Sequence, residues 1–190
     1  MKKYLKLIVA GLCLALGLAS LTACGGSGGG EKSEPTLCQT ECFSFMLPAG
    51  WNKIDTRDYT GEKDEEGNFP VNPAMVYVSK EAKGELEVLA KPSILLTYYN
   101  LHTTVMSAKS WYENTEDLDI QIDGAEVIEA YEGDSTIYDG FRYQIIWFKT
   151  ADAQFYVTIP SIQDGKETGL SWESEDVFSI IQSLSAVPEE

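Results

Sequence analysis

The sequence predicts an α+β domain, in which helices pack on an antiparallel β-sheet. Two observations lead to this fold class. Short apolar segments are separated by turn residues, as in hairpin-linked strands, and two other segments have the spacing of helices. Length and composition agree with it, because 190 residues with 44% hydrophobic side chains can bury a core without a metal or disulfide framework.

Seven segments are predicted as strands: residues 42–47, 51–55, 74–79, 93–99, 125–131, 136–149 and 154–159. Turn residues stand between them, such as Pro48 and Gly50 after the first segment and residues 132–135 between the fifth and sixth. Residues 57–72 are acidic and contain three turn-forming residues, Gly61, Gly67 and Pro70, so an exposed loop is expected there.

Segment 136–149 has the pattern of a central strand. Four large apolar residues would share one face of it: Phe141, Tyr143, Ile145 and Trp147. Ile146 and Phe148 make the far end apolar on the other face as well. A strand that is apolar on both faces is typical of the middle of a sheet that is covered on two sides.

Residues 107–117 are predicted as the first helix. Ala108, Trp111 and Tyr112 fall at i, i+3 and i+4, which is the spacing of one helical face.

A second helix is predicted near the end of the chain. Four apolar residues fall at i, i+3, i+4 and i+7 and form one stripe: Val177, Ile180, Ile181 and Leu184. Either Ser171 or Ser174 would cap its start, and Glu173, Glu175 and Asp176 would lie near the positive end of its dipole.

The N-terminus has the features of an export signal. Lys2, Lys3 and Lys6 precede an uncharged segment, residues 7–20. A bilayer span needs about 20 apolar residues, so this shorter segment suits the apolar region of a signal peptide better than a transmembrane helix.

The segment ends in Leu21-Thr22-Ala23-Cys24, which resembles the lipobox of bacterial lipoproteins. The resemblance implies cleavage between Ala23 and Cys24 and acyl chains, such as palmitate, on Cys24. Residues 1–23 would then be the signal peptide, and the protein would be exported and held at the cell membrane outside the cytoplasm. The alternative is an ordinary secretory signal followed by a chance cysteine.

Residues 24–35 follow as the lipidated cysteine and a tether rich in glycine and serine, and residues 36–187 as the globular domain. Cys38 and Cys42 remain in this domain. In an exported protein a disulfide between them is favoured, with the two sulfurs pairing across the base of a hairpin turn, while free thiols and a metal site are the alternatives. A metal site would need two more ligands, and the chain has one histidine.

Charge excludes one class of partner. The chain carries 30 acidic and 14 basic residues, a net charge of −16, and lacks the clustered Lys and Arg that nucleic-acid binding needs. Removal of the signal peptide would take three lysines and no acid, which leaves the domain still more negative. Anionic lipid would repel such a domain, so its body is expected to stand clear of the membrane surface.

The motif Phe43-x-Phe45-x-x-Pro48-x-Gly50-Trp51, together with the aromatic strands and final helix, resembles PsbP-like and DcrB-like exported domains. The resemblance covers roughly residues 36–187. It implies a sheet sandwiched between helices in proteins that support larger assemblies, a turn at Pro48 and Gly50, and a core position for Trp51. It supplies no catalytic set.

Three features were weighed as sites and interpreted as structural. Residues 119–124 overlap a calcium-binding EF-hand loop but lack its bidentate ligand, and Asp123-Gly124 suits a turn. Residues 64–66 are three acids of a solvated loop. The aromatic pairs Tyr98-Tyr99 and Trp111-Tyr112 and the aromatics of 141–147 could line a ligand groove, but core packing is the favoured interpretation. A fourth feature, His102, is expected at the surface or at the entry to a helix.

The sequence therefore predicts no catalytic residue, no metal site and no cofactor. The leading hypothesis is a non-enzymatic, membrane-anchored lipoprotein that acts as an interaction or accessory module for an envelope protein complex, with no nucleic-acid partner. The alternative is a lipoprotein that binds a small ligand or a divalent cation through the aromatic residues and the acidic loop.

Overall fold

The computed structural model describes residues 34–188. The predicted signal peptide, the predicted cleavage between Ala23 and Cys24, the predicted lipidation of Cys24 and most of the predicted tether lie outside these residues and stay predictions. The domain predicted at residues 36–187 lies inside the described range.

Strands dominate the described residues, of which 45% are strand and 9% helical. The strands are β1 (Thr36–Gln39), β2 (Phe43–Leu47), β3 (Asn52–Arg57), β4 (Val71–Ser79), β5 (Ile94–Asn100), β6 (Tyr112–Asp117), β7 (Glu126–Ser135), β8 (Arg142–Lys149), β9 (Ala153–Gln163), β10 (Lys166–Glu167) and β11 (Ser185–Ala186). The helical segments are α1 (Glu175–Gln182) and two 3₁₀ helices, η1 (Glu85–Glu87) and η2 (Lys109–Trp111).

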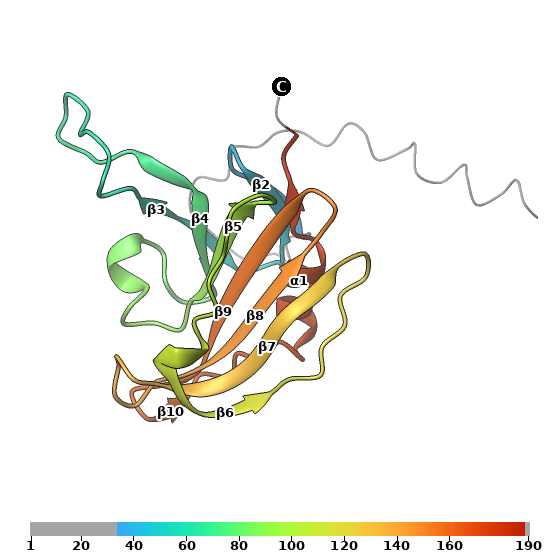
Figure 1. The fold of residues 1–190 in the computed structure, drawn as a ribbon. Helices are drawn as coiled ribbons and strands as arrows, with labels where there is room; N and C mark the ends of the chain where they lie inside the picture. Colours follow the sequence, from blue (N-terminus) through green and yellow to red (C-terminus); the bar gives the residue numbers. More distant parts are fainter. Residues whose placement is uncertain (1–33, 189–190) are drawn as a thin grey trace, which may run out of the picture.

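The strands form two antiparallel sheets. The large sheet has the order β3-β4-β5-β9-β8-β7-β6, and β10 pairs with β9 outside this path. The small sheet has the order β1-β2-β11. In Figure 1 the long strands β7, β8 and β9 lie side by side, with α1 and the small sheet behind them.

The predicted α+β sandwich, with helices packed on the sheet, is therefore wrong: the fold is β-rich. One α-helix exists in the described chain, and it shares the covered face of the large sheet with β2 and its neighbours. Hydrophobic periodicity showed which residues need a partner surface. It did not show that a second sheet, rather than a helix, supplies most of that surface.

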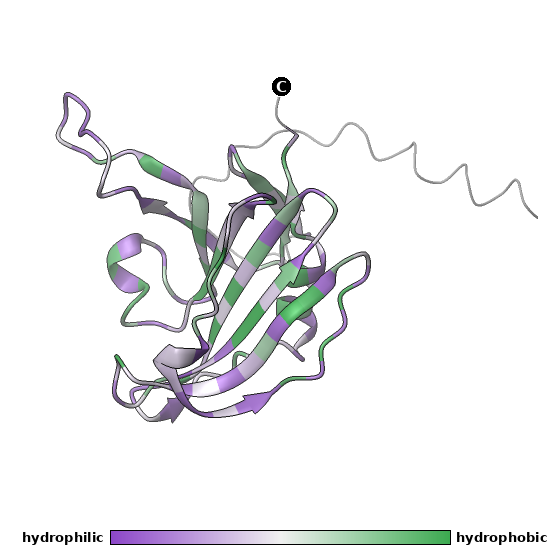
Figure 2. Ribbon diagram, in the orientation of Figure 1, coloured by the Kyte–Doolittle hydropathy of each residue, from purple (hydrophilic) through white to green (hydrophobic). Residues whose placement is uncertain are grey.

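The core lies between the large sheet and the layer formed by β2 and α1. Because alternate residues of a strand point to opposite faces, Phe155, Val157 and Ile159 of β9 enter it together. They meet Phe43 and Phe45 of β2, and all five side chains are at most 1% exposed. Figure 2 shows the alternation as apolar and polar bands along the large strands.

The central position predicted for segment 136–149 is confirmed by β8, which lies between β9 and β7, but the strand begins at Arg142 and residues 136–141 are a loop. Ile145 and Ile146 point to opposite faces of the sheet, and both are fully buried.

The predicted C-terminal helix is confirmed as α1, and its apolar stripe is buried: Val177, Ile180, Ile181 and Leu184. Ser174 occupies the N-cap position, but its hydroxyl donates to the carbonyl of Ser171 (2.8 Å) instead of capping the helix. Asp176 in the first turn accepts from Trp51 Nε1 (3.1 Å) and pairs with Lys80 (2.8 Å), which joins α1 to the strand region.

The helix predicted at residues 107–117 is absent from the structure, which has η2 and β6 there. β6 pairs with β7, with a bulge at Asn114, whose φ is +48°. Trp111, the largest residue of the expected apolar stripe, is 59% exposed. Three residues at helical spacing are a weak signal, and the backbone hydrogen bonds offered by the edge of β7 override it.

The turn predicted at residues 132–135 is also wrong, because these residues belong to β7 and the hairpin loop follows at 136–141. Glycine is required at position 133 because β6 passes close to it, and not because a turn forms there. A Cβ built there would lie 2.9 Å from Thr115 Cγ2 of the neighbouring β6.

The turn and core positions implied for residues 48–51 are confirmed. The Trp51 amide donates to the carbonyl of Pro48 (3.2 Å), Gly50 has a φ of +80°, and Trp51 is buried. The predicted acidic loop is confirmed at residues 58–70, which project beyond β3 and β4 in Figure 1. No helix within residues 34–188 is long and apolar enough to cross a bilayer.

Candidate functional site

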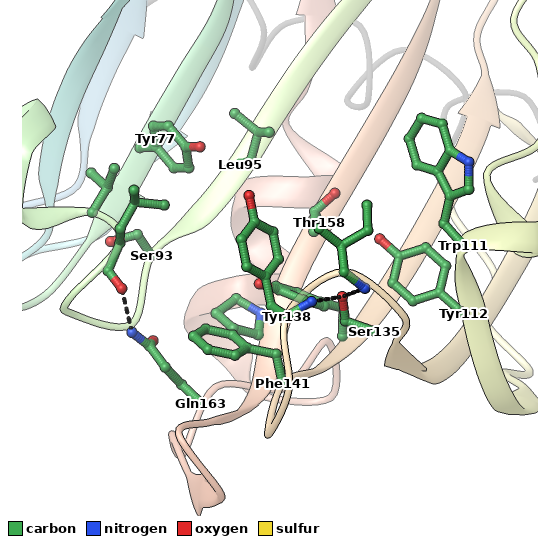
Figure 3. Close-up of a pocket in the computed structure, with 15 residues that line it drawn as sticks. Tyr77, Ser93, Leu95, Trp111, Tyr112, Ser135, Tyr138, Phe141, Thr158 and Gln163 are labelled. Atoms are coloured by element: carbon green, nitrogen blue, oxygen red, sulfur yellow. Dashed lines mark hydrogen bonds between the residues drawn. The ribbon is translucent and has the colours of Figure 1, made fainter.

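The face of the large sheet opposite the core carries a pocket of about 360 Å³ (Figure 3). Its floor comes from four neighbouring strands: Tyr77 of β4, Leu95 of β5, Thr158 and Pro160 of β9, and Tyr143 of β8. The register places Tyr77, Leu95 and Thr158 directly opposite one another across β4, β5 and β9, so they share one face.

Three separate segments form the walls. Val88 and Leu89 follow η1, Trp111 and Tyr112 join η2 to β6, and the hairpin loop between β7 and β8 brings Ile137, Tyr138 and Phe141. Figure 3 shows Trp111 and Tyr112 on the side opposite Tyr77 and Ser93, with Tyr138 and Phe141 between them.

Hydrogen bonds fix the wall beside η1. Gln163 Nε2 donates to the carbonyl of Leu89 (2.9 Å), which ties this segment to the end of β9. Ser93 Oγ donates to the carbonyl of Lys91 (2.9 Å) and shapes the entry into β5.

Hydrogen bonds hold the start of the hairpin loop at 136–141. The backbone amides of Ile137 and Tyr138 donate to Ser135 Oγ (3.2 and 3.1 Å). The amide and hydroxyl of Thr136 both donate to the carbonyl of Trp111 (3.0 and 2.9 Å), so the hairpin and η2 walls are joined directly.

Gly140 braces the tip of this loop against the turn between β9 and β10. The Gly165 amide donates to the carbonyl of Gly140 (2.9 Å), and Gly140 has a φ of +78°. A Cβ at Gly140 would lie 3.1 Å from the Gly165 nitrogen, so both the backbone conformation and the close approach require glycine.

Aromatic side chains form a continuous series along the pocket. The ring centroids of Tyr138 and Phe141 are 5.8 Å apart, and those of Phe141 and Tyr143 are 5.9 Å apart and stacked. Tyr112 meets Tyr143 edge to face at 6.2 Å. These separations lie in the range of favourable ring pairs, so each ring fixes the orientation of the next.

The pocket is electrically neutral. Of the 15 described residues that line it, none is charged, although the chain has 30 acidic side chains. Burial raises the pKa of Tyr143 to about 12, with further contributions from the nearby Tyr138 and Tyr77. Burial also raises the pKa of Tyr112 and of Tyr77. These tyrosines are therefore protonated at neutral pH and offer hydroxyl groups and ring faces, but no base or nucleophile.

The predicted cysteine pair lies in the small sheet, away from this pocket. Cys38 of β1 is opposite Phe45 of β2 in the ladder, and Cys42 precedes the first residue of β2, so Cys42 is not the ladder partner of Cys38. Burial and the nearby Glu41 raise the pKa of the Cys42 thiol. The disulfide stays a prediction.

The other features interpreted as structural lie apart from the pocket too. Asp123 and Gly124 form the predicted turn, but residues 118–122 are not a strand; Ile120 and Ile122 nevertheless enter the core. Asp64 accepts from the backbone amides of Glu66 (3.0 Å) and Asn68 (2.8 Å) and so holds its own loop. Within the described range, no three His, Cys, Asp or Glu side chains come together in an arrangement that could hold a metal ion.

His102 is exposed, as predicted, and its backbone amide donates to Asn100 Oδ1 (3.0 Å). It borders a second hollow of about 470 Å³ near the end of the chain, together with Tyr98 and Asp152.

The aromatic ligand groove, which the sequence left as the alternative to core packing, corresponds only in part to the pocket. Trp111, Tyr112, Phe141 and Tyr143 line it, whereas Tyr98 packs against the core. Tyr77, Tyr138 and the residues near η1 were missed. No sequence signal marked Ile137 and Tyr138, because both fall in the predicted strand 136–149; the structure places them in a loop, 63% and 54% exposed.

Comparison with protein-family models gave no match, and comparison with curated proteins gave none either. The function therefore has to be inferred from the pocket and from the sequence signals themselves.

Proposed function

We propose that this chain is a lipid-anchored protein outside the cytoplasm, without enzymatic activity, that holds a small and mostly apolar ligand in the tyrosine-rich pocket. The observation that carries the proposal is the uncharged, aromatic lining in a strongly acidic chain. A volume of about 360 Å³ lies within the roughly 300–1,000 Å³ of small-molecule pockets.

The chemistry of the lining supports binding rather than catalysis. Acid–base catalysis needs a group whose pKa lies near the working pH, and nucleophilic catalysis needs an activated side chain. The hydroxyls that line the pocket are protonated tyrosines and serine or threonine residues, and no histidine or carboxylate stands beside them in the described lining.

A thermal-shift screen of small, mostly apolar molecules, both uncharged and cationic, tests the proposal. Hits should raise the melting temperature of the wild-type protein. They should lose this effect in Leu95→Trp, where the larger side chain on the floor would fill the pocket. His102→Ala, which alters only the second hollow, is the matched control and should keep every hit. Hits that survive Leu95→Trp would bind elsewhere and contradict the proposal.

The lipid anchor is tested separately at Cys24. In Cys24→Ala the signal peptide should remain uncleaved by the lipoprotein pathway, and metabolic labelling with a fatty acid should be lost. A variant that is processed, labelled and membrane-bound as before would refute the anchor and leave the pocket untouched.

An accessory role in an envelope complex is the second candidate, and the pocket rim favours it. Leu86 of η1 is 96% exposed. Leu89 is 74% exposed and lines the pocket together with the exposed Trp111, Ile137 and Tyr138, which gives the pocket an apolar border. A photo-crosslinking residue at position 86 should capture one defined partner in the native envelope. The same residue in place of the exposed Leu37 of β1 is the control and should not.

A further inference from the structure

We propose that the ligand of the tyrosine-rich pocket is a quaternary ammonium compound, a methylated organic cation without N–H groups. This inference rests on the proposed function and names its ligand class. Two observations support this ligand class: the pocket lining is uncharged and aromatic, and the chain around it is strongly acidic. The aromatic residues of the lining are Tyr77, Trp111, Tyr112, Tyr138, Phe141 and Tyr143.

The rings supply the attraction. The face of an aromatic ring is negative, and a cation over it is stabilised, most strongly where water is excluded. The protein already uses this interaction elsewhere, since lysine ammonium groups lie 4.6 to 5.3 Å from the rings of Phe69, Trp51 and Tyr131. None of these three rings lines the pocket, so the lining rings of the described chain are not occupied by those lysines.

The oxygens of the pocket add to the negative potential. Burial raises the pKa of Tyr77, and Tyr138 and Glu85 add to this effect; burial also raises the pKa of Tyr143, and Tyr138 and Tyr77 add to it. Asp139 sits beside Tyr138 in the hairpin loop, and Asp164 lies next to Gly140 at the loop tip. The pocket lining is thus neutral, while two acids belong to or lie next to the hairpin loop that forms one of its walls.

The absence of a carboxylate in the described lining selects among cations. A primary ammonium group carries three N–H donors and a guanidinium five, and each donor loses free energy if it is buried without an acceptor. Part of the acceptor capacity is used, because Leu89 O accepts from Gln163 Nε2 and Ser135 Oγ accepts from the amides of Ile137 and Tyr138. A quaternary ammonium has no donor to satisfy, and its charge is spread over methyl groups that fit an apolar lining.

The test compares choline with its uncharged isostere, 3,3-dimethylbutan-1-ol, by calorimetric titration of the full chain. The two molecules have the same shape, so only the charge differs. Choline should bind at least tenfold more tightly. The affinity for choline should decrease when NaCl is raised from 10 to 300 mM, because the screening length shortens, while the affinity for the isostere should stay unchanged.

Two substitutions of Tyr138 make the test specific to the ring. Tyr138→Phe keeps the ring and should bind choline nearly as well as the wild type. Tyr138→Leu removes the ring but keeps an apolar side chain. The affinity for choline should therefore fall several-fold, while the affinity for the isostere should stay the same. Because Tyr138 is exposed, both variants should remain folded.

Equal affinity for choline and the isostere, or no choline binding, would overturn the inference. The proposed function is judged separately by the screen with Leu95→Trp. A protein that binds uncharged hits through the pocket but shows no preference for the cation would keep the function and lose the ligand class.

Discussion

Gly133 is the position where a single added methyl group should most clearly reveal how β6 packs. In Gly133→Ala the new Cβ would lie 2.9 Å from Thr115 Cγ2, 3.0 Å from Tyr112 Cβ and 3.2 Å from the carbonyl oxygen of Glu113. The first contact is shorter than real Cβ contacts allow, and the third involves backbone, so β6 itself has to shift.

The magnitude follows from two opposing effects. Alanine is favoured over glycine inside a strand by about 0.5–1 kcal/mol, because less backbone entropy is lost on folding. Overpacking costs about 1–3 kcal/mol. The net expectation for Gly133→Ala is a loss of between about 0 and 2.5 kcal/mol in the free energy of unfolding. For a chain of this size that lowers the melting temperature by roughly 2–4 °C per kcal/mol.

The assay is urea denaturation followed by tryptophan fluorescence, with thermal unfolding as a second measurement. Gly84→Ala is the matched control. Gly84 has an extended backbone with φ of −157° and nothing within 4 Å of a built Cβ. Since alanine fits there without strain, that variant should gain about 0.4–1 kcal/mol.

A second substitution separates the steric cause from other effects. Thr115→Ser removes Cγ2 and leaves the Tyr112 Cβ, at 3.0 Å, as the closest contact to an added methyl group at position 133. The double variant should therefore recover part of the loss. If Gly133→Ala proves as stable as Gly84→Ala, or if Thr115→Ser restores nothing, the close approach of β6 to β7 is not what makes glycine necessary.

Three further predictions concern the core, the helix start and the pocket. Ile180→Ala should lose about 2–5 kcal/mol, since the side chain is fully buried under the sheet, whereas the exposed Ser179→Ala should change little; equal effects would contradict the packing of α1. The hydrogen bond from Lys80 lowers the pKa of Asp176 in the folded protein. The Asp176 carboxylate therefore stabilises the fold above the unfolded pKa of about 3.9, and this stabilisation is lost as pH falls through the folded pKa. Asp176→Asn should therefore cost less than about 1 kcal/mol at neutral pH, because the carboxylate is 42% exposed, and the difference should vanish in acid; a constant difference in urea midpoints across pH would refute it. With a pKa of about 12, Tyr143 should stay protonated through pH 10.5, so Tyr143→Phe and the wild type should show the same rise in tyrosinate absorbance up to that pH. A smaller rise in the variant would show that Tyr143 ionises below pH 10.5 and that its hydroxyl is not buried.

Most strands could be predicted because each follows from a short pattern. The segments at 42–47, 51–55, 74–79, 93–99 and 154–159 correspond to β2, β3, β4, β5 and β9, and the C-terminal stripe to α1. In these segments burial follows period 2 or period 3.6, and local turn residues mark the ends. Local pattern and tertiary packing agree there.

The errors arose where two local patterns compete. Ala108, Trp111 and Tyr112 satisfy helical spacing, yet the open edge of β7 provides a ladder for β6, and Trp111 is left exposed at the pocket wall. Gly133 reads as a turn residue, but its purpose is to let β6 approach. Both depend on which strand lies alongside, and a one-dimensional pattern does not contain that information.

By itself, the sequence determined the acidity of the chain and the apolar faces that needed to be buried, and it predicts export and lipidation at Cys24. The tertiary structure alone decided that a second sheet and one helix cover the core face, and that Tyr77, Trp111 and Tyr138, from three distant segments, meet on the opposite face. The reason is that a pocket exists only through long-range register. Tyr77 reaches its neighbours through β5 and β9, whereas Tyr138 comes from the loop after β7, and no local propensity brings them together.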